Sequence, residues 1–111
     1  MLKVKVLSNT GNELCFNVYN EIEKYMRFRY RCKLLDASGQ EVYFEPCKDS
    51  YKPNVFVDIQ KSKKVFIRLN KDIEVGMVFK CIIEEKDNHL NAEIHNHTFS
   101  FRFMRNEWEE I

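Results

Sequence analysis

The sequence predicts an all-β fold, a single-domain antiparallel sandwich or closed barrel of about eight or nine short strands. Residues 26–34 alternate apolar side chains with the cations Arg27, Arg29, Arg31 and Lys33. A helix, with about 3.6 residues per turn, does not produce this period of two. Nine Phe and five Tyr against two Ala also favour pleated sheet over helix.

Strand-like segments separated by turn-forming residues follow one another along the whole chain. They span residues 2–7, 13–19, 25–35, 41–45, 55–60, 64–69, 77–85, 90–95 and 98–103. One short helix is expected at residues 21–25, because Asn20 and Glu23 have the spacing of a capping box. With 111 residues, no low-complexity linker and no internal repeat, residues 1–111 are expected to form one domain.

The first predicted hairpin turns at residues 36–40. Asp36 begins a type I turn, and Gly39 takes the left-handed position that forms a bulge. The resulting cross-strand pairs are Leu34 with Val42, Cys32 with Phe44, Lys33 with Tyr43 and Arg31 with Glu45. Arg27 and Arg29 extend past this partner strand and have no predicted counter-charge, so they are candidates for contact with phosphates or with the carboxylates of an acidic partner.

A second hairpin is predicted around residues 61–63. It pairs Ile59 with Val65, Val57 with Ile67 and Val55 with Leu69. The opposite face of this hairpin then holds Phe56, Lys64, Phe66 and Arg68. Aromatic side chains on a basic strand face bind single-stranded nucleic acid by stacking and charge neutralisation. The alternative is that a packed strand or loop covers this face and buries both phenylalanines.

The apolar alternation changes phase near the C-terminal end of the sequence. Ile94 belongs to one phase, whereas Phe99, Phe101 and Phe103 belong to the other, which predicts a turn or bulge at residues 95–97. The histidines in or beside the predicted turns are His89, His95 and His97. Their ring nitrogens are not expected to converge on a metal ion, since a turn leaves them exposed and apart.

Charge and cysteine spacing exclude several classes of protein. Eighteen cations against seventeen acids leave a net charge of +1, which argues against a strongly basic nucleic-acid binder or a polybasic membrane module. The four cysteines are widely spaced without a C-x-x-C motif, so reduced, mostly buried thiols are expected rather than disulfides or zinc. No signal-like segment and no span of about 18 apolar residues occurs, so the cytoplasm is the expected location.

No sequence motif indicates catalysis or a cofactor. A Gly-rich phosphate loop, a G-x-S-x-G motif and a cysteine beside a predicted base are all missing. The sequence therefore predicts a small non-catalytic module, such as an inhibitor or accessory factor, with a protein partner. The candidate contact residues are Arg27, Arg29, Tyr51 in the long loop at 46–54, and Trp108, which is expected to fold back onto the body. Single-stranded nucleic acid is the alternative partner.

Overall fold

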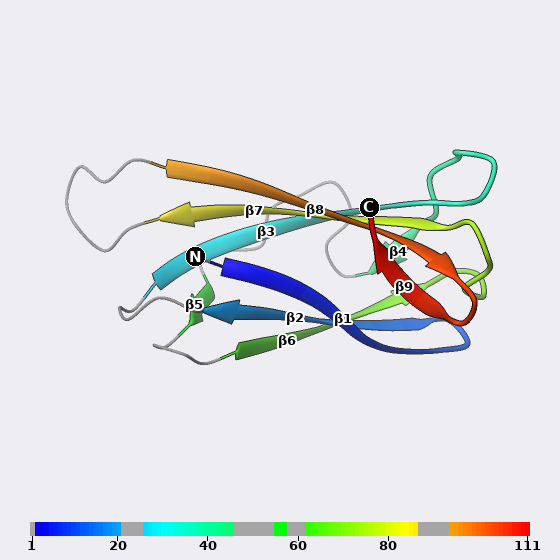
Figure 1. Ribbon diagram of the computed structural model, residues 1–111, viewed down its shortest axis with the longest axis horizontal. Helices are drawn as coiled ribbons and strands as arrows, with labels where there is room; N and C mark the ends of the chain where they lie inside the picture. Colours follow the sequence, from blue (N-terminus) through cyan, green and yellow to red (C-terminus); the bar gives the residue numbers. More distant parts are fainter. Residues whose placement is uncertain (1, 21–25, 46–54, 58–61, 87–93) are drawn as a thin grey trace.

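In the part of the chain that the structure describes, nine strands form two antiparallel sheets packed face to face (Figure 1). This computed structural model describes residues 2–20, 26–45, 55–57, 62–86 and 94–111. Sheet A, in the order β1-β2-β6-β4, comprises β1 (Leu2–Thr10), β2 (Glu13–Asn20), β6 (Ser62–Leu69) and β4 (Phe44–Glu45). Sheet B, in the order β5-β3-β7-β8-β9, comprises β5 (Val55–Val57), β3 (Met26–Leu35), β7 (Val78–Lys86), β8 (Ile94–Met104) and β9 (Glu107–Glu110).

The predicted all-β class is confirmed, and the architecture is the sandwich rather than the closed barrel. Among the described residues, no ladder of hydrogen bonds joins the edges of the two sheets. The same residues include no helix with the length and apolarity that a membrane span requires. The predicted helix at 21–25 and the long loop at 46–54 lie outside the described residues.

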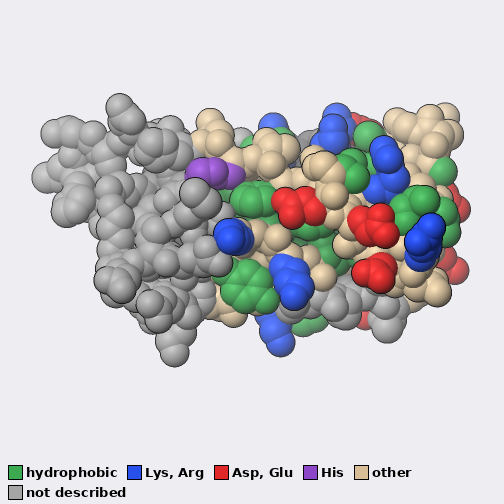
Figure 2. Space-filling view, viewed as in Figure 1, with side chains coloured by type: hydrophobic (Ala, Val, Ile, Leu, Met, Phe, Trp, Pro, Cys, Tyr) green, Lys and Arg blue, Asp and Glu red, His purple; other side chains and the backbone are tan. Residues whose placement is uncertain are grey.

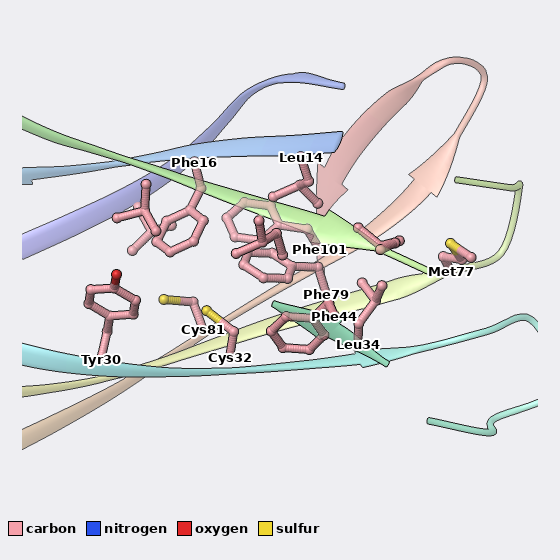
Figure 3. Close-up of a cluster of buried hydrophobic side chains, with 14 of the residues drawn as sticks. Leu14, Phe16, Tyr30, Cys32, Leu34, Phe44, Met77, Phe79, Cys81 and Phe101 are labelled. Carbon is pink, nitrogen blue, oxygen red and sulfur yellow. The ribbon is translucent and has the colours of Figure 1, made fainter. Parts of the chain in front are cut away.

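Side chains from both sheets fill one hydrophobic core (Figure 3). The rings of Phe16 in β2 and Phe79 in β7 lie 5.2 Å apart between centroids, and Tyr30 in β3 meets Phe16 edge-on at 5.8 Å. Burial of each such side chain contributes about 1.5–3 kcal/mol. The largest fully buried side chains are Phe16, Phe44, Phe79, Leu14, Leu34, Ile67, Met77, Ile83 and Val18.

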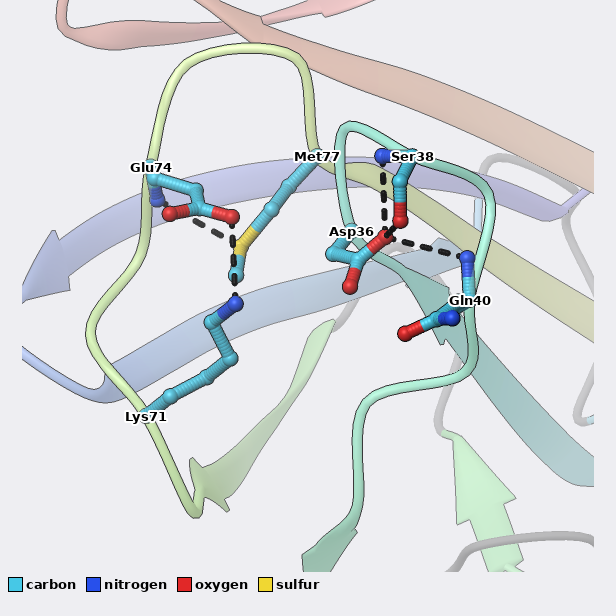
Figure 4. Close-up of polar contacts among 6 residues, drawn as sticks. All are labelled: Asp36, Ser38, Gln40, Lys71, Glu74 and Met77. Carbon is cyan, nitrogen blue, oxygen red and sulfur yellow. Dashed lines mark hydrogen bonds and ion pairs between the residues drawn. The ribbon is translucent and has the colours of Figure 1, made fainter.

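The predicted turn after β3 is confirmed and is held by the Asp36 carboxylate (Figure 4). Asp36 Oδ1 accepts hydrogen bonds from the Ser38 hydroxyl at 2.6 Å, the Ser38 backbone N–H at 2.9 Å and the Gln40 backbone N–H at 3.0 Å. These bonds, led by the Ser38 hydroxyl, lower the pKa of Asp36. Gly39 has the predicted left-handed backbone, with a φ of 90°.

The strand pairing predicted beyond this turn is formed only as far as Val42, whose backbone N–H donates to the Leu34 carbonyl at 2.9 Å. Leu35 and Glu41 form one bridge in the predicted register, but Phe44 then pairs with Leu69 of sheet A. Between residues 41 and 44 the chain therefore crosses from one sheet to the other. The predicted pairs of Arg31 with Glu45, Lys33 with Tyr43 and Cys32 with Phe44 are not formed, because Phe44 and Glu45 pair with β6 of sheet A instead.

The second predicted hairpin is wrong. β5 and β6 do not pair with each other. β5 pairs with β3 in sheet B, whereas β6 lies between β2 and β4 in sheet A. Central placement lets the apolar side of β6 bury Val65, Ile67 and Leu69 in the core. Its opposite side remains on the surface of the sandwich.

The predicted turn at residues 95–97 is replaced by continuous strand. β8 keeps an unshifted register with β7 from Ile94, opposite Lys86, to Arg102, opposite Val78. Ile94 and Thr98 both occupy outward-facing positions of β8, whereas Phe101 and Phe103 occupy inward-facing ones. The apolar alternation in the sequence therefore changes phase although the strand is continuous. The chain then reverses at Arg105 and Asn106 and adds β9, a strand that the sequence analysis did not predict.

Candidate partner-binding face

The outer face of sheet A is the side opposite the core. Alternation along β6 places Lys64, Phe66 and Arg68 there, and all three are exposed. Register partners on the same face are Glu13, Cys15, Asn17 and Tyr19 of β2, Lys3 and Lys5 of β1, Ser62 of β6 and Glu45 of β4. Phe66 is 59% exposed, although burial of a phenylalanine would normally be favourable.

One half of this face, termed the aromatic half, surrounds Arg68. The strand register places Arg68 between Glu13 of β2 and Glu45 of β4. The Tyr43 hydroxyl donates to Glu45 Oε1 at 3.3 Å, and Tyr43 is 51% exposed. Two shallow hollows, of about 270 and 180 Å³, adjoin Arg68, one of them against Phe66 and the other against Tyr43. Two exposed aromatic side chains thus flank an arginine on an open sheet surface.

The other half, termed the lysine half, lies toward the start of β1. Here Asn17 lies between Lys5 and Lys64 in the strand register, and Tyr19 lies between Lys3 and Ser62. The Asn17 side chain is only 4% exposed although it belongs to the outer face, and its Oδ1 atom accepts no hydrogen bond. Three lysines from two strands therefore surround a polar centre.

Cys15 lies beside Phe66 at the boundary between the two halves. Burial raises the pKa of the Cys15 thiol, and the nearby Lys64 ammonium partly opposes this effect. A raised pKa keeps the thiol protonated near neutral pH and makes it a poor nucleophile. Cys32 and Cys81 are also buried, as predicted, whereas Cys47 lies outside the described residues.

Arg27 and Arg29, predicted to lack a counter-charge, belong to sheet B. In the backbone register, Arg29 lies opposite Glu84, a buried residue of β7, and Arg27 lies opposite Lys86 and Phe56. The register thus places an acidic position beside Arg29. The sequence missed this neighbour because β7 is about 50 residues away along the chain.

The four residues predicted for nucleic-acid binding do not share one face. Lys64, Phe66 and Arg68 remain together on sheet A, but Phe56 is part of β5 in sheet B. The prediction failed because it assumed that β5 and β6 are hairpin partners.

Tyr51 lies outside the described residues, whereas Trp108 is placed in β9. As predicted, Trp108 folds back: its ring lies 5.2 Å from Phe103 and 6.3 Å from Phe79 between centroids. Among the histidines, His97 is within β8, with its ring 6.4 Å from that of Phe99. In the described ranges, no three side chains of the metal-ligating kinds His, Cys, Asp and Glu come together.

The comparisons with known proteins assign no family. The chain matches no protein-family model, and no curated protein resembles it in sequence. The functional inference therefore depends on surface chemistry.

Sequence reasoning missed several members of the candidate face, chiefly Tyr43, Glu13, Lys3 and Lys5. The alternation of Lys3, Val4 and Lys5 is the signal that could have placed both lysines on an outward face. Their proximity to Lys64 depends on β2 lying between β1 and β6, which no local pattern indicates.

Proposed function

We propose that this chain is a small non-catalytic binding module of the cytoplasm, an inhibitor or accessory factor that docks a protein partner on the aromatic half. The observation that supports this function best is the exposure of Phe66 and Tyr43 on either side of Arg68. Aromatic residues and arginine are the side chains most enriched at energetic hot spots of protein interfaces. Buried thiols at Cys15, Cys32 and Cys81 are consistent with a reducing compartment.

The charges around Arg68 favour a protein over a nucleic acid at the aromatic half. Glu13 and Glu45 occupy the positions on both sides of the guanidinium. Two carboxylates would repel a phosphate backbone, whereas a protein surface can offer both signs of charge. The aromatic half is therefore complementary to a protein surface that offers an apolar side chain together with polar groups of both charges.

The test is capture of binding proteins from the host lysate with immobilised wild type and variants. Phe66→Ala and Arg68→Glu should each reduce recovery of the specific partner at least about tenfold, as loss of a hot-spot contact does. Val75→Ala is the matched control, because Val75 is also 59% exposed but lies outside the face. Thermal unfolding should show that both face variants keep the wild-type fold, since these side chains are exposed. Equal recovery by all four proteins would remove the aromatic half from the site.

A second candidate, single-stranded nucleic acid, is favoured by the lysine half. Lys3 lies beside Tyr19, Lys5 and Lys64 lie on either side of Asn17, and Phe66 lies on the same strand as Lys64. Such a surface could neutralise phosphates while the aromatic rings stack on bases.

Fluorescence anisotropy of labelled single-stranded DNA and RNA, at low and at physiological salt, separates the two candidates. Nucleic-acid binding requires an affinity that falls with salt and falls further with Lys64→Glu. An absence of binding even at low salt would dismiss this candidate and leave the protein partner.

A further inference from the structure

A groove of about 430 Å³ lies on the open side of the sandwich, between β1 of sheet A and the β8–β9 hairpin of sheet B. Both elements lie in the foreground of Figure 1, and Figure 2 shows apolar, basic and acidic side chains mixed on this side. The residues that line the groove are Lys3, Val4, Lys5, Tyr19, Phe101 and Glu110. Its volume falls within the range of ligand-binding clefts.

The lining residues show that the groove follows the edge of β1 rather than one of its faces. Lys3, Val4 and Lys5 are consecutive, and consecutive side chains of a strand point to opposite faces. A cavity that touches all three reaches both faces of β1 and so passes its edge, with Tyr19 of β2 lining it on the outer face. Phe101 and Glu110 form the opposite wall, from the other sheet.

β1 is the terminal strand of sheet A at this edge. Within the described ranges, β2 is its only ladder partner, so its second edge presents backbone donors and acceptors that no described strand pairs with. A free strand edge can accept an added strand from another chain, with affinity from the main-chain hydrogen bonds.

We propose that the edge of β1 binds an extended segment of a partner protein in which apolar and acidic side chains alternate. Apolar side chains of the added strand would enter the groove against Val4, which is buried, and Phe101. The intervening side chains would face outward beside Lys3 and Lys5, both exposed and about 7 Å apart along the strand. Acidic residues at these outward positions match the two lysines, whereas Glu110, which shares a face with Phe101, lies on the side of the apolar positions.

The same lysines argue against a second copy of this chain at the edge. If two β1 strands paired antiparallel, the outward rows of lysine would lie across from each other. Like charges on directly opposed positions destabilise a strand pair, and lysines on an edge are a common protection against self-association. The charge of β1 thus selects an acidic strand over its own copy.

A titration of ¹⁵N-labelled protein with synthetic peptides, followed by NMR, tests the proposal. The probe is matched to the nine residues of β1 and alternates glutamate with valine, and the control peptide replaces glutamate with lysine. The acidic peptide should shift the amides of residues 2–6 and of Phe101 and slow their hydrogen exchange. In the double variant Lys3→Glu, Lys5→Glu, its affinity should fall about tenfold, whereas the lysine peptide should bind this variant better than the wild type.

Three outcomes would overturn the proposal: no shifts at millimolar peptide, equal affinity for both peptides, or shifts located away from β1. If the amide signals of β1 broaden as the protein concentration rises without peptide, the edge binds a second copy of the chain instead. The test is independent of the aromatic half, because Phe66→Ala should leave the peptide affinity unchanged. Loss of lysate capture with intact peptide binding would contradict only the proposed function of the aromatic half. Loss of peptide binding with intact capture would contradict only the proposal for the β1 edge.

Discussion

At the scale of single residues, Trp108 shows how tertiary packing determines the role of a side chain. Its ring lies against Phe103 and Phe79 at the edge of the core. The indole Nε1 is buried but donates to no acceptor. Such an unsatisfied donor costs about 1–3 kcal/mol, so part of the stabilisation from ring burial is offset.

We therefore predict different effects for two substitutions of Trp108. Trp108→Ala should lower the free energy of unfolding by about 2–3 kcal/mol, because it removes the ring contacts. Trp108→Phe should lower it by less than about 1 kcal/mol, because it keeps an aromatic ring and removes the buried N–H. Urea unfolding followed by circular dichroism measures both values. A loss of less than about 1 kcal/mol for Trp108→Ala as well would mean that the ring packing contributes little.

At the scale of secondary-structure elements, the β8–β9 turn contains avoidable strain. Arg105 and Asn106 are its central residues, and both have positive φ, at 51° and 64°. Positive φ at both positions defines a two-residue type I′ turn, which matches the twist of a hairpin and favours Asn-Gly. Arginine is an unfavourable residue for this backbone because of its Cβ atom.

The double variant Arg105→Asn, Asn106→Gly should therefore stabilise the protein by roughly 0.5–1 kcal/mol. Differential scanning calorimetry should record this gain as a higher Tm. Arg105→Lys is the matched control and should leave Tm unchanged, because lysine meets the same steric restriction. A gain in the control, or none in the double variant, would contradict the turn assignment.

At the scale of the whole molecule, the ladders join segments that are distant in sequence. β3 pairs with β7 and β2 with β6, so residues such as Cys32 and Cys81, or Phe16 and Val65, become direct neighbours. Loop-closure entropy must be overcome before these ladders are stabilised, which makes such sandwiches slow to fold.

We predict that refolding takes milliseconds to seconds rather than microseconds. Stopped-flow dilution from urea measures it, with the fluorescence of Trp108, the only tryptophan of the chain, as the probe. A submillisecond phase that accounts for the whole signal change would show that local contacts dominate folding.

The sequence alone determined the fold class, the approximate position of most strands and the core-facing side of several of them. In β3, for example, Tyr30, Cys32 and Leu34 are buried while Lys33 is exposed, as the alternation predicts. The turn with Gly39 was also predictable. Each of these features is local, because the period of two belongs to a strand whatever its partner, and the turn depends on a few adjacent residues.

Only the tertiary structure decided which strands are neighbours and which side chains share a face. In the structure, β4 belongs to sheet A, Phe56 and Phe66 lie in different sheets, and Arg68 lies between Glu13 and Glu45. Many strand partners and registers satisfy the same local alternation, so short-range patterns do not discriminate among them. The observed pairing is selected because it lets both sheets bury their apolar faces against each other. The free energy of this burial depends on residues far apart in the chain.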